Sequence, residues 1–225
     1  MDLSAILTLD KFIYLFYGAL MSLGIALVAV IGGILIGIIV AILKLSRHFI
    51  PRLIGNIYVE VLRGTPMLLQ ILFIYLGIPV LYQLITGEGL RMNIYVCGTL
   101  AMALNSAAYC AELIRSGILG IDKGQTEAGI TLGLDQMTIM RLIILPQAIR
   151  RIIPPLVSEF ITLIKDSSLL GTIGVMELLN RAKILGVNNY NYLVTLLMAS
   201  VMYLVMTVFI SFVSRKLERR LMLND

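Results

Sequence analysis

The chain has 225 residues, of which 59% are hydrophobic and only 14% are charged, and its formal net charge is +5. Soluble domains carry about 25% charged residues, so this composition excludes an ordinary soluble protein and predicts an integral membrane protein. The basic residues lie in short clusters between apolar runs, which is typical of membrane orientation and unlike a nucleic-acid-binding surface.

Five apolar segments are long enough to cross a bilayer as helices, which takes about 20 residues each. They are residues 12–43, 53–85, 92–113, 142–170 and 192–213. The first is too long for the apolar core of a signal peptide, so we expect a retained span. Gly64-Thr65-Pro66 interrupts the second, and prolines interrupt the fourth. The half-apolar segment 171–187 is expected to form a short re-entrant or surface helix.

The basic clusters indicate how the spans are oriented. Those expected on the cytosolic side are Lys44, Arg47 and Arg52; Arg115, Lys123 and Arg141; and Arg215, Lys216, Arg219 and Arg220. The loop between the second and third spans contains only Arg91. The positive-inside rule therefore predicts an extracytoplasmic N-terminus, five crossings and a cytosolic C-terminus, although Arg181 and Lys183 weaken the bias. No linker separates two domains, so residues 1–225 are predicted to form one all-α domain.

The sequence contains no recognisable catalytic or metal centre. Cys97 and Cys110 fall in one predicted helix, roughly 20 Å apart, which is too far for a disulfide. The single histidine, His48, has no cysteine or histidine at ligand spacing. We therefore predict two buried free thiols, no metal site and no enzymatic activity in this chain.

A polar segment at about residues 122–141 separates the third and fourth spans. Asp122 can cap a helix, and Gln125 three residues later can reach back in a capping box. Gly133 offers a left-handed helix end, and Asp135 can cap a second helix. We predict a helix–turn–helix on the cytosolic surface and call these residues the elbow.

The elbow also suits a docking role. Glu127 supplies a charge, and the small residues Ala128 and Gly129 let another protein approach closely. On these residues alone, a merely well-capped connector remains an alternative.

The elbow pattern resembles the Glu-Ala-Ala loop of ABC-importer permeases. It consists of Glu127-Ala128-Gly129, three residues, Gly133, nine residues and then Ile143-Ile144-Leu145-Pro146. Gly129 departs from the second alanine of the family. Other stretches resemble the polar amino acid permeases: residues 60–66 with Gln70, residues 105–109 with Glu112 and Arg115, Gly124-Gln125, Pro146-Gln147-Ala148, and residues 165–169. The resemblance covers roughly residues 15 to 220.

The resemblance implies a permease bundle whose elbow seats in a cytosolic ATPase. The residues expected to couple the two are Gln125, Glu127, Ala128, Gly129 and Gly133. The implied partners are the ABC ATPase, a second copy or sister permease, an extracytoplasmic amino-acid-binding protein and membrane lipid, in a bacterial inner membrane. No cofactor is expected in this chain, since the ATPase binds ATP and Mg.

Charges at membrane depth cost several kcal/mol and need a reason. Glu60 and Arg63, three residues apart, can pair on one helix face as a structural ion pair or as part of an inner gate. Pro66 removes a backbone hydrogen bond, so the second span is expected to kink just after this pair.

Two polar stripes suggest a substrate path. Glu159, Thr162 and Asp166 share one helix face, and the third span carries a similar face. That second face consists of Asn105, Ser106 and Tyr109. If the stripes face each other, an ammonium group lies near Glu159 and a carboxylate near Ser167, Ser168 or the backbone at Gly171.

Structural roles compete with this interpretation. Glu159 and Asp166 can instead pair with Arg151, Lys165 or a partner subunit, and for Asp166 the structural role is favoured.

These observations together predict the membrane-spanning subunit of an ATP-driven importer for a polar amino acid. The acidic Glu159 favours basic or polar over apolar substrates. The alternatives are a secondary amino acid transporter or channel driven by an ion gradient, and a membrane anchor without a transport path.

Overall fold

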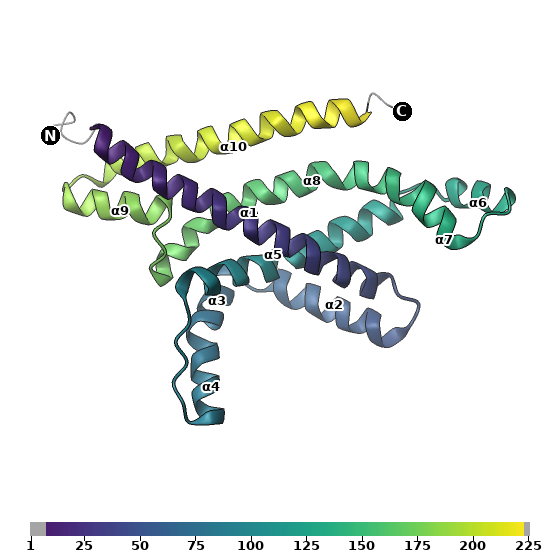
Figure 1. The fold of residues 1–225 in the computed structure, drawn as a ribbon, viewed down its shortest axis with the longest axis horizontal. Helices are drawn as coiled ribbons and strands as arrows, with labels where there is room; N and C mark the ends of the chain where they lie inside the picture. The colour runs from purple at the N-terminus through teal and green to yellow at the C-terminus, as the bar shows by residue number, and fades with distance from the viewer. Residues whose placement is uncertain (1–7, 223–225) are drawn as a thin grey trace.

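The structure, a computed structural model, describes residues 8–222, except for the side chains at positions 217 and 220–222 near the end of the last helix. The described chain is helical and contains no strand, which confirms the all-α prediction (Figure 1). In chain order, its elements are α1 (Leu9–Leu45), α2 (Phe49–Gly64), α3 (Met67–Leu72), η1 (Phe73–Gly77), α4 (Ile78–Thr86), α5 (Ile94–Leu119), α6 (Lys123–Thr131), α7 (Gln136–Ile139), η2 (Met140–Ile144), α8 (Leu145–Asp166), η3 (Ser167–Ile173), α9 (Leu178–Asn188) and α10 (Tyr192–Met222).

The centre of the fold is a close contact between α1 and α5, which small residues allow. A Cβ atom added at Gly33 would lie 2.8 Å from the Ser106 hydroxyl, and one added at Gly37 would lie 2.8 Å from the Cys110 Cβ. Glycines four residues apart on one helix face are typical of tightly packed membrane helices. Gly24 on the same helix faces open space, so not every glycine of α1 serves this contact.

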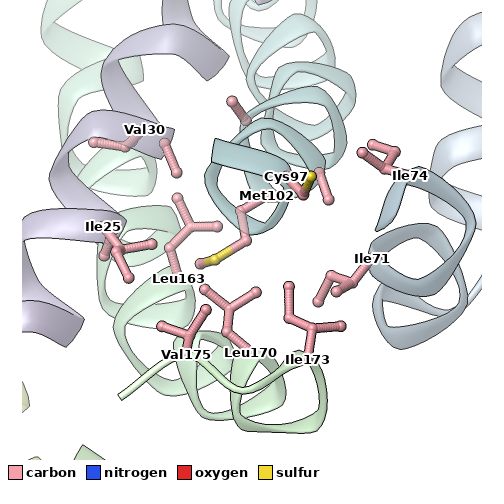
Figure 2. Close-up of a cluster of buried hydrophobic side chains, with 14 of the residues drawn as sticks. Ile25, Val30, Ile71, Ile74, Cys97, Met102, Leu163, Leu170, Ile173 and Val175 are labelled. Atoms are coloured by element: carbon pink, nitrogen blue, oxygen red, sulfur yellow. The ribbon is translucent and has the colours of Figure 1, made fainter. Parts of the chain in front are cut away.

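The main hydrophobic core gathers side chains from α1, α3, η1, α5, α8, η3 and the segment that follows η3 (Figure 2). Its labelled members are Ile25, Val30, Ile71, Ile74, Cys97, Met102, Leu163, Leu170, Ile173 and Val175. Cys97 and Cys110 are both buried free thiols, as predicted. Burial of these side chains fixes η3 and the end of α8 against the α1–α5 pair.

The expected second span, residues 53–85, is not one kinked helix. α2 ends at Gly64, Thr65 and Pro66 are extended, and a new helix begins at Met67. In Figure 1, α4 projects away from the other helices at a steep angle to α2. The break is complete because Pro66 offers no N–H to continue the helix, and the residue before a proline avoids helical angles.

Four helices of the described chain are long and apolar enough to cross a membrane: Leu9–Leu45, Met67–Thr86, Ile94–Leu119 and Tyr192–Lys216. The expected fourth span is the continuous helical segment from η2 through α8 to η3, and it is not among them. α8 carries Arg150, Arg151, Glu159, Lys165 and Asp166 along its length. Five crossings and the orientation of the termini therefore stay predictions.

Candidate functional site

The elbow has the local geometry that its sequence predicts. Asp122 accepts a hydrogen bond from the Gly124 N–H at 2.7 Å, and Asp135 accepts one from the Met137 N–H at 3.1 Å. Between the two helices, Gly133 adopts a left-handed φ of 77°. The Gly133 and Leu134 N–H groups donate back to the Ile130 and Gly129 carbonyls, which is the hydrogen-bond pattern of a Schellman helix end. A hydrogen bond from the Thr138 hydroxyl holds the pKa of Asp135 below its usual value.

The faces of α6 differ from the expectation at Gly129. Glu127 and Ala128 are exposed, but Gly129 is buried. A Cβ at Gly129 would lie 2.8 Å from Ile139 Cγ1, so this glycine makes room for the second half of the elbow. Its predicted role in a partner's approach is therefore wrong. Sequence reasoning also missed the exposed Ile130 and Leu132, which lie within the matched motif and place apolar surface beside Glu127.

Polar contacts attach the elbow to the helices around it. Gln125 does not complete the predicted capping box with its side chain; its Oε1 accepts a hydrogen bond from Gln147 of α8 at 3.2 Å. Arg47, in the α1–α2 loop, donates to Gln136 of α7 at 3.4 Å. Arg151 of α8 donates to the Gly120 carbonyl at the end of α5. The elbow is thus linked directly to α8.

A polar pocket of about 370 Å³ lies between the α2–α3 break, α5 and α8. Its lining residues are Thr65, Pro66, Met67, Asn105, Tyr109, Glu159, Thr162 and Asp166. The two predicted polar stripes therefore do face each other. The third wall, Thr65-Pro66-Met67, was predicted only as a kink and not as part of a site. The sequence feature that could have indicated this wall is a proline between a polar and an apolar residue, a few positions after the charged pair.

Two predicted pathway residues do not line this pocket. Ser106 is buried, lies 3.7 Å from the Cys110 sulfur and also interacts with Glu159. Ser167 is buried and donates to the Ile164 carbonyl at 2.7 Å. Ser106 is thus buried beside Cys110 instead of lining the pocket, and the Ser167 hydroxyl forms a hydrogen bond within its own helix end.

The expected Glu60–Arg63 ion pair does not form. The guanidinium of Arg63 lies 5.0 Å from the centre of the Tyr109 ring, a cation–π arrangement, and Glu60 is exposed. The charge of Arg63 attracts the Glu159 carboxylate and that of Asp166 repels it, but Arg63 and Glu159 do not form one of the ion pairs of the described residues. The pairings of Glu159 with Arg151 or Lys165, considered from the sequence, are not found among the ion pairs of the described residues.

A separate ionic cluster joins α1 to α5. Glu112 forms ion pairs with Lys44 and with Arg115, the latter at 3.0 Å. Glu112 and Arg115 belong to the stretches that carried the resemblance. Here Glu112 connects α5 to α1, Arg115 pairs with Glu112 within α5, and neither residue lines the pocket.

Comparisons with known proteins identify the family of the chain. The family model "Binding-protein-dependent transport system inner membrane component" matches residues 33–223. The putative glutamine transport system permease protein GlnP of Rickettsia typhi is 38% identical over 95% of each chain. The arginine transport system permease protein ArtQ of Bacillus subtilis is also 38% identical, over 100% of this chain and 99% of its own.

Solved structures give the same result. The crystal structure of an amino acid ABC transporter with histidines matches with a TM-score of 0.89 and 35% identity, over 98% of this chain and 99% of that one. The MetNI methionine ABC transporter in an inward-facing conformation shares the fold, with a TM-score of 0.76 at 19% identity. A secondary transporter or a simple anchor is thereby excluded. The chain belongs to the binding-protein-dependent transport system inner membrane components, as the non-catalytic permease subunit of an amino acid ABC importer.

Proposed function

We propose that this permease carries a polar amino acid through the pocket between the α2–α3 break, α5 and α8. The observation that carries the proposal is the convergence of Glu159, Asp166 and Asn105 on one cavity. Its volume of about 370 Å³ falls within the range of roughly 300–1,000 Å³ that is usual for small-molecule sites. The relatives named for glutamine and arginine transport support a substrate rich in N–H groups.

The charges of the pocket favour a cationic group. Glu159 and Asp166 are acidic and lie on one face of α8, so an ammonium or guanidinium group is attracted there. Thr162 and Tyr109 add hydroxyl groups that can donate or accept. A basic amino acid brings two cationic groups to the two acids, whereas an apolar one brings only its α-ammonium group.

The elbow is the proposed ATPase-docking surface. Its exposed face combines the Glu127 carboxylate with Ala128, Ile130 and Leu132, while Gln125, Gly129 and Gly133 shape and attach it. We propose that ATP and Mg bind only in the partner ATPase. Movements of the elbow then reach the pocket along α8, since Gln125 contacts Gln147 at its start and Glu159 lies further along it.

The proposed assembly contains a second copy or a sister permease in a bacterial inner membrane. In each of the helices Met67–Thr86 and Tyr192–Lys216, only 11% of the most apolar stretch is buried. These helices therefore have ample surface for another subunit or lipid. We retain five crossings with an extracytoplasmic N-terminus and a cytosolic C-terminus, which the basic clusters support.

Uptake into proteoliposomes with the ATPase and binding protein tests the pathway. Glu159→Gln removes the charge while keeping the shape, and we expect roughly tenfold slower uptake of a basic amino acid. Glu88→Gln, an equivalent change at an exposed site between α4 and α5, is the control. Unchanged uptake by the Glu159 variant would refute the pathway.

A further inference from the structure

The α2–α3 break leaves backbone carbonyls at the end of α2 without their usual donors. Pro66 has no N–H, so the Leu62 carbonyl four residues earlier loses its helical partner. The helix also lacks a left-handed glycine end, because Thr65 is extended, with φ −116° and ψ 145°. The Thr65 hydroxyl caps one carbonyl, that of Val61, at 2.8 Å.

Two side-chain amides replace the missing donor at Leu62. Gln70 Nε2 donates to the Leu62 carbonyl at 2.8 Å and lies 3.1 Å from the Thr65 carbonyl. Asn105 Nδ2, from α5, donates to the same Leu62 carbonyl at 3.1 Å and to Gln70 Oε1 at 3.0 Å. We call Gln70 and Asn105 the amide pair.

The amide pair also determines how Asn105 meets the pocket. Asn105 is only 6% exposed, yet it lines the cavity. Its N–H groups are occupied by Leu62 and Gln70, and none of the described groups donates a hydrogen bond to its Oδ1. The amide is therefore held with its oxygen free as an acceptor, on the same cavity as Glu159 and Asp166.

We propose that the amide pair is a positioning element for the transported amino acid. It fixes the Thr65-Pro66-Met67 wall and orients the Asn105 oxygen to accept from a donor group of the substrate, such as an ammonium or amide N–H. This inference rests on the proposed transit role of the pocket. Gln70 itself does not line the pocket, so it acts through Asn105 and the wall.

Gln70→Met tests this role, since it keeps the side-chain length but removes both the donor and the acceptor. The measurement is equilibrium binding of labelled glutamine and arginine to the purified permease–ATPase complex without binding protein. We expect Kd to rise roughly tenfold, while the yield of the complex and its maximal ATP hydrolysis stay unchanged. Gln83→Met, at an exposed glutamine of α4, is the matched control and should leave Kd unchanged.

Coupling within the pair gives a second test. Asn105→Leu should raise Kd at least as much as Gln70→Met, and the double variant should be no worse than Asn105→Leu alone, because the two residues act as one unit. Additive effects would overturn the proposal.

Further outcomes separate this inference from the proposed function. If Glu159→Gln weakens binding but Gln70→Met does not, the positioning role is wrong and the pathway stands. If neither weakens binding, both are wrong. If Gln70→Met prevents assembly of the complex, binding is measured instead with Gln70→Glu, which keeps the acceptor for Asn105. If both variants fail to assemble, the amide pair has a purely structural role and the proposal is overturned.

Discussion

The elbow and the pocket are both built where helices are interrupted, but their polar groups are satisfied in different ways. In the elbow, Asp122, Gly133 and Asp135 bond to backbone groups within five residues. At the pocket, the Leu62 carbonyl depends on amides 8 and 43 residues away. The elbow is therefore a local unit whose shape survives changes elsewhere, whereas the shape of the pocket depends on how α5 packs against the break.

Reversing the charge of the elbow should have the largest effect. We expect Glu127→Lys to lower uptake by about tenfold or more and to prevent co-purification of the ATPase, because like-charge contacts in an interface cost several kcal/mol. Glu88→Lys, at an exposed site in the α4–α5 loop, is the control. Normal uptake and normal coupling to the ATPase in Glu127→Lys would contradict the docking role. If the elbow and the pocket have different roles, Glu159→Gln should leave co-purification of the ATPase intact.

Adjacent residues of α6 should respond in opposite ways. Gly129→Val introduces atoms against Ile139, and such overpacking costs about 1–3 kcal/mol of unfolding free energy. Ala128→Val, on the exposed face, should change stability by less than about 0.5 kcal/mol but weaken ATPase binding. Thermal unfolding and co-purification of the two variants measure both effects. Equal stability losses would contradict the assigned faces.

Gly133→Ala should have a smaller effect, which is confined to the elbow. Its φ of 77° is unfavourable for any residue with a Cβ, so we expect a loss of about 1 kcal/mol in stability. Gly24→Ala, where a Cβ meets nothing within 4 Å, is the control and should be neutral or slightly stabilising. If Gly133→Ala leaves the stability unchanged, the turn must have an alternative conformation.

The pH dependence of the α7 cap should be the smallest effect. Because the folded pKa of Asp135 lies below its usual value of 3.8, its stabilising contribution is complete above that value and is lost as the pH falls through the folded pKa. Amide exchange at Met137 and Thr138 measures this loss. Asp135→Asn keeps a helix cap but should remove the pH dependence. If the acid transition is unchanged in that variant, another group causes the transition.

The difference between the two regions also explains what the sequence could predict. The Asp122 and Asp135 caps and the Gly133 turn follow from spacing and local hydrogen bonding, and the structure confirms their geometry. Spacing also predicts the polar stripes of α5 and α8, but whether they face each other depends on packing. The inward face of Gly129 depends on packing. So does the position of Arg63, which lies over the Tyr109 ring instead of pairing with Glu60, because a partner on another helix is not encoded in local spacing.

The close contact of α1 and α5 has a consequence for movement during transport. With Gly33 against Ser106 and Gly37 against Cys110, rotation of either helix about its axis would drive a bulkier side chain into its neighbour. Glu112 joins the same helices through Lys44. We therefore expect the two helices to move as one body, so that opening and closing of the pocket comes from α8 and from the segment beyond Thr65.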